Sequence, residues 1–465
     1  MPLRLLDRRP RATPVAVAGP AAAPRVGRVA RVAGVLSSSY GDLGAPLRLP
    51  PFRWLWISTS AWNLARWMEL PLTGWVALSL TGSPAAVALL GVTRTALLPL
   101  VAPISGVLAD RVDRVRLVRF AQWGNALVVC ALAAALLAGR GAYWQLVLAT
   151  LWLGLSWGLD WPARRALAAD LVGRRQVLQA VLLDGVSQNV ARVAGSLLAG
   201  GLLAVWGGAV AVAVLAAVYV AAALAVLRVR APRTAGQPAP APGPPGTVPP
   251  RRSVWQEVLA GIVAARRDPV VWAVLLVGVL MDALLMQYQT LLAVFAELVL
   301  SVGPVELGWM GAATGVGATL GLLVLPLVRD GRHQALAYAG GSLLTGVAVL
   351  LFALSPVLQV ALPLLVLAGL GTAAFATMQT TLLLSRTTPA MRGRILGLQA
   401  LTIGSAPLGA FELSRLVEGL GAPLAVAINA AVCTAAVAAV SWRSGLLRPE
   451  PGAPEGGQAA PGRAA

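Results

Sequence analysis

The chain has 465 residues, of which 58% are hydrophobic and only 12% are charged, and its formal net charge at pH 7 is +19. Soluble domains have about a quarter of their residues charged, so this composition excludes a soluble globular protein. The sequence contains no Lys, which excludes the Walker A loop of an ATP-driven pump. Its single His and two Cys exclude a His/Cys zinc cluster and a disulfide framework. We therefore expect no metal and no cofactor.

Residues 1–50 are rich in Ala, Pro, Val and Arg, and they predict a disordered, basic extension in the cytoplasm. Uninterrupted apolar stretches of roughly 20 residues then recur from Trp54 to Leu446, each long enough to cross ~30 Å of hydrocarbon. Continuous apolar runs favour helices over the alternating strands of a barrel. The sequence therefore predicts an all-α membrane protein.

Clusters of Gly, Pro and Arg divide the apolar sequence into twelve predicted transmembrane helices. Six form an N-terminal bundle within 51–230, at about 54–80, 84–108, 115–138, 143–167, 178–205 and 208–228. Six form a C-terminal bundle within 268–446, at about 270–298, 304–328, 334–354, 357–385, 393–418 and 422–443. A Pro-rich linker (231–252) and an amphipathic surface helix (253–267) join the two halves, and a disordered tail (447–465) follows.

The connections between successive spans lie alternately on the two sides of the membrane and so form two sets, and the arginines are unevenly distributed between these sets. One set holds Arg111 to Arg119, Arg164 to Arg175, the linker arginines and Arg386 to Arg394, whereas the short connections of the other set hold only Arg140. The positive-inside rule places the arginine-rich set, and with it both termini, in the cytoplasm of a multi-pass plasma-membrane protein. The net charge then reflects topology and contact with anionic lipids, and no nucleic-acid partner is expected.

The connection between the second and third spans, "GVLADRVDRVRL" (106–117), packs several charges between two apolar segments. Its Asp110 can face the positive N-terminus of a neighbouring helix, and its arginines can pair with carboxylates at the membrane rim. The spacing alone fits two interpretations about equally well, a conformational gate or a basic loop that only sets topology.

The pattern Gly-x-Leu-Ala-Asp-Arg-x-x-Arg in this loop resembles the signature loop of the major facilitator superfamily. Further similar stretches are "RWMELPLTGWVALSLTGSP", "WPARRALAADLV", "NVARVAGSLLAG", "QYQTLLAVFA" and "RGRILGLQALTIGSAPLGA", and the similarity covers roughly 52–440. Within this superfamily, the chain resembles a bacterial branch that includes siderophore and macrolide exporters. The resemblance implies two six-helix halves that alternate access to a central site. It also implies a gating loop that latches the outward-facing state, formed by Gly106, Asp110, Arg111, Arg114, Arg116, Gly393 and Arg394.

Charged residues inside predicted spans are functional candidates, because a buried ion is costly unless it has a partner or faces a cavity. Arg66 and Glu69 are spaced to pair with each other, as are Glu412 and Arg415. Asp282 has no basic neighbour at helical spacing, and burial favours the neutral form of a carboxyl group, so it is a proton-coupling candidate with Glu69. The candidates for the substrate cavity are Arg66, Trp67, Arg94, Asn189, Arg192, Gln287, Gln289, Gln379 and Glu412. Trp62, Trp75, Trp152, Trp157 and Trp161 are further candidates to line an apolar pocket.

Together these features favour a monomeric, proton-driven exporter of a hydrophobic or amphiphilic small molecule, such as a drug or a siderophore-like compound. A membrane scaffold or sensor that keeps the fold is an alternative. An importer of a polar nutrient also fits the fold, but the spans contain few polar residues. A membrane enzyme fits least, because the sequence shows no nucleophile–base–orienter set.

Overall fold

The computed structural model describes residues 43–98, 101, 112–173, 176–230, 254–325, 328, 331–388 and 391–447. Within these ranges the chain is helical and has no β-strand. Most of the N-terminal extension, the linker and the C-terminal tail lie outside the described residues, and so do Gly106, Asp110 and Arg111 of the gating loop. The all-α prediction is confirmed.

The N-terminal half begins with a short 3-10 turn and continues with long helices that start at residues suited to helix N-termini. Pro50 and Pro84 occupy the first helical positions of α2 and α3, where the missing N–H costs nothing. Asp113 caps α5 by accepting a hydrogen bond from the backbone N–H of Val115. The elements are η1 (Ala45–Arg48), α2 (Pro50–Thr81), α3 (Pro84–Thr95), α5 (Arg114–Leu137), α6 (Tyr143–Val172) and α7 (Val177–Leu227).

The fifth and sixth predicted spans form one long element, α7, with a sharp break in its middle. Gly207 has φ +74° and ψ 176°, a conformation that glycine adopts at no steric cost. The break falls between the predicted spans 178–205 and 208–228, so α7 contains both. The described parts of the twelve predicted spans are helical except at 96–97, 404–405, 328 and a few positions at the ends of other spans.

The C-terminal half has regular helices and two irregular crossings. The regular ones are α8 (Val254–Arg267), α9 (Pro269–Leu280), α11 (Pro304–Val324), α12 (Gly331–Ala353), α13 (Leu358–Arg386) and α16 (Ala422–Arg443). The seventh crossing continues from α9 through the π-helix η2 (Met281–Leu285), the 3-10 helix η3 (Met286–Leu291), α10 (Leu292–Val294) and the π-helix η4 (Phe295–Val299). The eleventh, predicted as one helix, is two: α14 (Arg392–Ile403) and α15 (Ala406–Leu420). Pro407 at the start of α15 cannot continue the α14 hydrogen-bond ladder.

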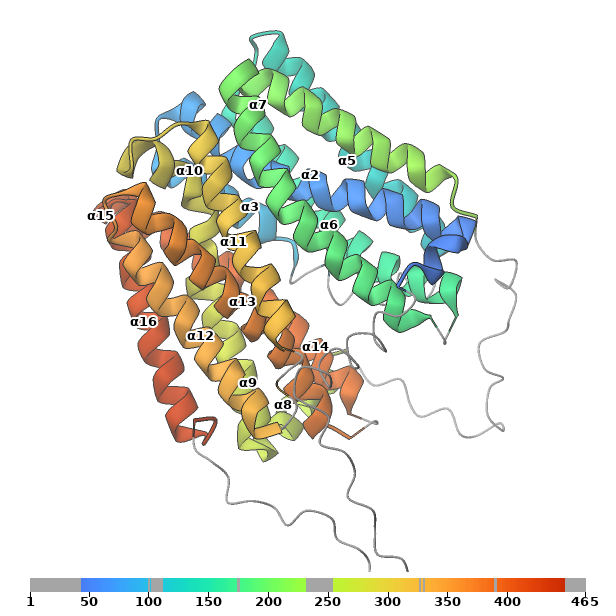
Figure 1. Cartoon of the computed structure of the whole chain (residues 1–465), viewed down its shortest axis with the longest axis vertical. Helices are drawn as coiled ribbons and strands as arrows, with labels where there is room; N and C mark the ends of the chain where they lie inside the picture. Colours follow the sequence, from blue (N-terminus) through green and yellow to red (C-terminus); the bar gives the residue numbers. More distant parts are fainter. Residues whose placement is uncertain are drawn as a thin grey trace, which may run out of the picture. The chain divides into compact units, whose positions relative to one another are not determined.

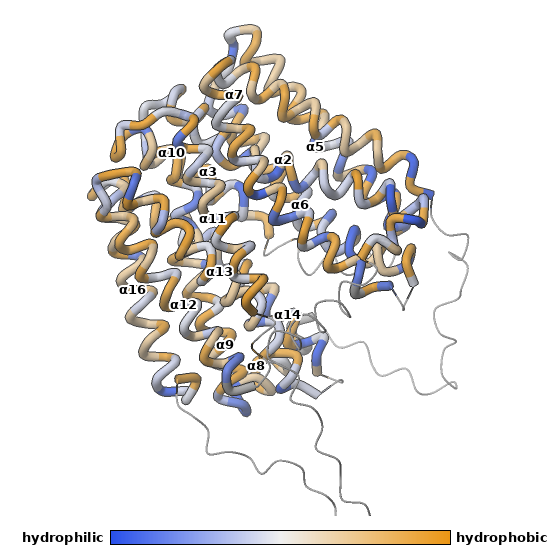
Figure 2. Tube along the Cα trace, viewed as in Figure 1, coloured by the Kyte–Doolittle hydropathy of each residue, from blue (hydrophilic) through white to orange (hydrophobic). Residues whose placement is uncertain are grey.

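Seven helical segments of the described chain are long and apolar enough to cross a membrane. They are Arg114–Leu137, Gln179–Leu227, Pro269–Val299, Pro304–Val324, His333–Ala353, Leu358–Arg386 and Ala422–Arg443. Gln179–Leu227 holds two predicted crossings around Gly207, and α2 and α6 are long but carry charged residues and several tryptophans. Hydrophobic residues run along the lengths of the helices in Figure 2. The chain is a multi-pass membrane protein.

The amphipathic helix predicted at 253–267 forms as α8, and one of its faces packs against α14 and α9. Gly261 and Ala265 are buried, and a Cβ on Gly261 would lie 3.3 Å from Leu398 of α14. Leu259 and Val263 lie one turn apart on this helix and form an apolar stripe, with exposed fractions of 59% and 54%. This exposed stripe is consistent with a helix that lies on a membrane surface.

The two halves contact each other mainly through α7 with α11, α3 with α15, and α2 with α10. Figure 1 shows α7 and α11 side by side. A Cβ on Gly200 of α7 would lie 2.5 Å from the carbonyl oxygen of Pro304 and 2.8 Å from the Cα of Gly308, both in α11. The Ser414 hydroxyl of α15 donates a 3.2 Å hydrogen bond to the carbonyl oxygen of Ala85 in α3.

These contacts lie near one set of helix ends, which we call the arginine-poor side. It comprises the connections at 82–83, 138–142, 206–208, 300–303, 354–357 and 421, in which Arg140 is the one basic residue. Gly200 precedes the break at Gly207 by seven residues, and Gly308 follows the 300–303 connection by five. The halves are thus held together on the arginine-poor side.

Candidate functional site

A cavity of about 190 Å³ lies between the two halves. One wall comes from α2, α3 and α6, and the other from η2, η3 and the α14–α15 region. Its lining residues are Arg66, Trp67, Leu70, Arg94, Thr95, Trp157, Asp282, Met286, Gln287, Gln289, Thr290, Ile403 and Ala406. The irregular winding of the seventh crossing supplies five of them, because the π and 3-10 turns at 281–291 change which side chains face the other half.

Arg66 faces this cavity and stacks on an aromatic ring. Its guanidinium carbon lies 3.8 Å from the centroid of Trp157 and 5.7 Å from that of Trp62. It makes no ion pair with a residue that the structure describes. The positive charge of Arg94 and the negative charge of Glu69 both lie near enough to act on Arg66, in opposite directions. Arg66 is therefore a cation held by aromatic faces.

Glu69 pairs with Arg94 instead of with Arg66, its predicted partner. The Arg94 Nη1 atom lies 3.1 Å from Glu69 Oε1, and the Tyr219 hydroxyl donates a 3.1 Å hydrogen bond to Glu69 Oε2. Glu69 is 2% exposed and points into the N-terminal bundle, toward α3 and α7, whereas Arg66 points into the cavity. The spacing of Arg66 and Glu69 on one helix allows a pair, but Arg94 and Tyr219 on neighbouring helices contact the buried Glu69 carboxylate instead.

Asp282 faces the cavity from the C-terminal half. The Thr402 hydroxyl of α14 donates a 3.0 Å hydrogen bond to Asp282 Oδ2, and Gln287 Nε2 donates a 2.9 Å hydrogen bond to the Asp282 carbonyl oxygen. No basic residue of the described chain forms an ion pair with this carboxyl group. Asp282 therefore has the setting expected of a group that gains and loses a proton.

Arg192 lies behind the cavity wall. Its guanidinium carbon is 4.2 Å from the centroid of Trp67, and its Nε atom is buried with no acceptor among the described residues. The arginine side chain packs against Gly315 of α11, where a Cβ would come within 3.2 Å of it. Arg192 thus supports Trp67 at the junction of the halves.

The remaining sequence candidates divide between the cavity and the bundle interiors. Trp67, Arg94, Gln287 and Gln289 line the cavity. Asn189 Nδ2 donates to the Gly185 carbonyl oxygen of its own helix (2.8 Å), and Gln379 Oε1 accepts from Gln399 Nε2 (3.1 Å). Glu412 Oε2 accepts a 2.8 Å hydrogen bond from Asn429 Nδ2, while Arg415 is 3.7 Å from Glu418, so the predicted Glu412–Arg415 pair is not formed.

Other lining residues were not among the cavity candidates. These residues have no sequence signal that separates them from ordinary span residues: Leu70, Thr95, Met286, Thr290, Ile403 and Ala406. Trp157 was expected at an apolar pocket as one of several span tryptophans, and it lines this cavity together with Trp67.

The described part of the gating loop is engaged within the N-terminal half. Arg114 forms an ion pair with Asp170 of α6, and Arg116 Nε lies 3.9 Å from Asp113. On the other half, Arg394 Nη1 lies 3.3 Å from Met391 Sδ, and a Cβ on Gly393 would meet nothing within 4 Å. Because Asp110 lies outside the described residues, its contact with Gly393 and Arg394 stays a prediction.

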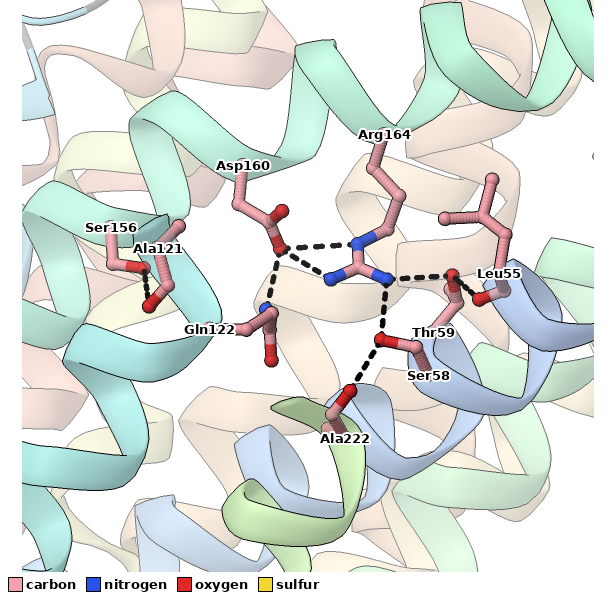
Figure 3. Close-up of polar contacts among 9 residues, drawn as sticks. All are labelled: Leu55, Ser58, Thr59, Ala121, Gln122, Ser156, Asp160, Arg164 and Ala222. Atoms are coloured by element: carbon pink, nitrogen blue, oxygen red, sulfur yellow. Dashed lines mark hydrogen bonds and ion pairs between the residues drawn. The ribbon is translucent and has the colours of Figure 1, made fainter. Parts of the chain in front are cut away.

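A buried polar cluster away from the cavity joins α2, α5, α6 and α7 of the N-terminal half (Figure 3). Asp160 Oδ2 accepts hydrogen bonds from Gln122 Nε2 (2.9 Å) and from Arg164 Nε and Nη2 (3.1 and 3.0 Å). Arg164 Nη1 donates to Ser58 and Thr59 of α2 (3.2 and 3.1 Å). The intramembrane Asp160 is thus neutralised by a buried partner, which is a structural role.

Comparisons with known proteins agree with this architecture. The family model of transmembrane secretion effectors matches residues 42–451. The enterobactin exporter EntS of Shigella boydii serotype 18 is 28% identical over 323 residues, which cover 69% of this chain and 73% of the relative. EntS of Citrobacter koseri is 28% identical over 336 residues, which cover 71% of this chain and 75% of that relative.

Two solved structures have the same fold at low sequence identity. The nucleoside transporter NupG superposes with a TM-score of 0.64 at 13% identity, over 87% of this chain and 100% of that one. A bacterial homolog of the human lysosomal transporter Spinster superposes with a TM-score of 0.61 at 17% identity, over 85% and 95%.

Replacing Glu69 with Gln should destabilise the N-terminal bundle, because it leaves the guanidinium of Arg94 buried without its carboxylate. We expect the free energy of unfolding to fall by about 3 kcal/mol, and to recover partly in the double variant Glu69→Gln/Arg94→Gln. Glu412→Gln is the matched control, since it weakens one amide hydrogen bond and should cost about 1 kcal/mol. Unfolding of the detergent-purified variants measures this, and equal losses at Glu69 and Glu412 would contradict the pairing.

Proposed function

The chain belongs to the transmembrane secretion effector family, within the major facilitator superfamily, and we propose that it exports a hydrophobic or amphiphilic small molecule by alternating access. One observation carries this proposal. A cavity lies between two six-helix halves, and among the described residues these halves contact each other mainly on the arginine-poor side. A transporter of this kind binds its substrate at the junction of two halves and opens to each side in turn.

The cavity lining suits an amphiphile. Trp67, Leu70, Trp157, Met286 and Ile403 offer apolar surface, with a few charged and amide groups between them. Ligand sites typically combine such a surface with a small number of polar groups that fix orientation. The likeness to enterobactin exporters supports a siderophore-like compound as the substrate, and a drug-like amphiphile fits the same lining.

We propose that transport is driven by protons and that Asp282 carries them. A carboxylate at the cavity wall is unfavourable while the cavity is closed and dry, and it is tolerated when water enters from one side. Its proton affinity then depends on conformation, as proton coupling requires. Glu69 is the second candidate, but its charge is already balanced by Arg94 at 3.1 Å.

The distribution of arginines supports an orientation with the arginine-rich ends and both termini in the cytoplasm of a plasma-membrane protein. The halves would then meet on the outer side, and the cavity would open inward to collect its substrate. An impermeant thiol reagent added outside intact cells should label a Cys at Gly303 and miss one at Gly236 in the linker. Labelling of Gly236→Cys but not of Gly303→Cys would reverse the orientation.

The function is tested with inverted membrane vesicles and a panel of labelled amphiphiles. We expect the labelled compound to accumulate inside these vesicles, because inversion of the membrane makes an exporter pump its substrate inward. An acidic interior should increase this accumulation, since protons leaving the vesicle would drive the exchange. Accumulation only in right-side-out vesicles would favour a nutrient importer, and none in either would favour a scaffold or sensor. With a transported compound, reconstituted Asp282→Asn should bind it but lose substrate-driven proton movement.

Glu412→Gln is the control for Asp282, because Glu412 is a second carboxyl group of the C-terminal half that does not line the cavity. This variant should keep the proton movement. A reconstituted Asp282→Asn chain that still changes the internal pH when substrate is added would contradict the role of Asp282, and Glu69 would become the candidate.

A further inference from the structure

The charges at the cavity are not balanced. Arg66 and Arg94 belong to its lining, and Arg192 stacks behind the lining residue Trp67. The carboxyl groups nearby are Glu69, which is paired with Arg94, and Asp282, which lies on the opposite wall. Three guanidinium groups and two carboxyl groups therefore lie in or directly behind the lining, so this region stays positive even when both carboxyl groups are ionised.

Arg66 is the residue that presents this excess positive charge to the cavity. Its planar face lies over Trp157, at 3.8 Å from the ring centroid, and it has no hydrogen bond or ion pair with the described residues. A guanidinium stacked by its face keeps its N–H donors in the plane of the group, where they fit two oxygen atoms of one acceptor. A charge in a site of low dielectric constant is costly unless an opposite charge meets it.

We propose that Arg66 is the anchor for an anionic oxygen group of the substrate, so that the transported compounds are amphiphilic anions rather than lipophilic cations. The apolar part of the ligand lies against Trp67, Leu70 and Met286, which line the same cavity. The anion takes the place at the Arg66 N–H groups that no carboxylate of the described chain occupies. This inference rests on the proposed transport function and specifies its substrate class.

The test measures the affinity of the detergent-purified full chain for three probes with the same ring system: 1-naphthoate, 1-naphthamide and 1-naphthylmethylamine. Ligand-observed NMR titration covers the weak affinities of such fragments. We expect the anion to bind about tenfold more tightly than the neutral amide, the gain typical of a charge-assisted hydrogen bond, and the cation to bind most weakly. An excess of chloride should compete poorly, since it lacks the apolar part.

Substitution of Arg66 then tests the anchor itself. Arg66→Gln should weaken naphthoate binding about tenfold and leave naphthamide unchanged, and Arg66→Lys should restore part of the difference because it keeps the charge. Arg140→Gln, in an exposed connection on the arginine-poor side, is the matched control and should change neither affinity. The Lys variant also covers the case in which the Gln variant does not fold.

The inference is overturned if the anion and the amide bind equally well, if the cation binds best, or if Arg66→Gln leaves naphthoate binding unchanged. These results are independent of the transport assay. Vesicles that export neutral or cationic amphiphiles while the purified chain shows no preference for naphthoate would leave the proposed function intact and remove this inference. A clear preference for naphthoate in a chain that transports nothing would support the anion site at Arg66 and contradict the proposed transport function.

Discussion

The close approach of the α7 and α11 backbones is the contact on which the arrangement of the two halves depends. Lipid gives little hydrophobic drive for one helix to join another, so small residues that permit close packing decide where transmembrane helices meet. At Gly200 and Gly308 neither helix has a side chain, and the backbones touch. With α3 against α15, this contact closes the arginine-poor side and leaves the cavity between the halves.

The buried charged residues fall into two groups, those paired within one half and those that face the cavity between the halves. Within the N-terminal half, Glu69 of α2 and Arg94 of α3 form an ion pair between two helices, and Asp160 and Arg164 form one within α6. Arg66 and Asp282 face the cavity from opposite halves without a charged partner among the described residues. Charges that balance within one half need no further partner, whereas Arg66 and Asp282 at the junction are the charges for which we propose a substrate and a proton as partners. This division supports the functional roles proposed for Arg66 and Asp282.

The helices were predictable from the sequence because apolar runs, Pro at helix starts and the Asp113 cap are local signals. The break at Ser405 in the eleventh span was missed although Pro407 is a local signal for it, whereas the π and 3-10 turns after Met281 have no such local signal. The same limit applies to the site. Helical spacing allowed Arg66 to pair with Glu69, but the choice of Arg94 required the position of α3, which no local pattern encodes. The three charged residues of the lining, Arg66, Arg94 and Asp282, were nevertheless predicted, because a charged residue is rare inside an apolar span.

The most direct test of this account compares two neighbouring glycines. A Cβ at Gly200 would press into α11, whereas a Cβ at Gly201 meets nothing within 4 Å, so Gly200→Ala and Gly201→Ala share helix and chemistry but differ in this contact. Spin labels at Thr81 and Gly419, in a chain without Cys130 and Cys433, report the separation of the halves on the arginine-poor side. The account predicts longer distances for Gly200→Ala and unchanged ones for Gly201→Ala. Identical distance distributions for both variants would contradict it.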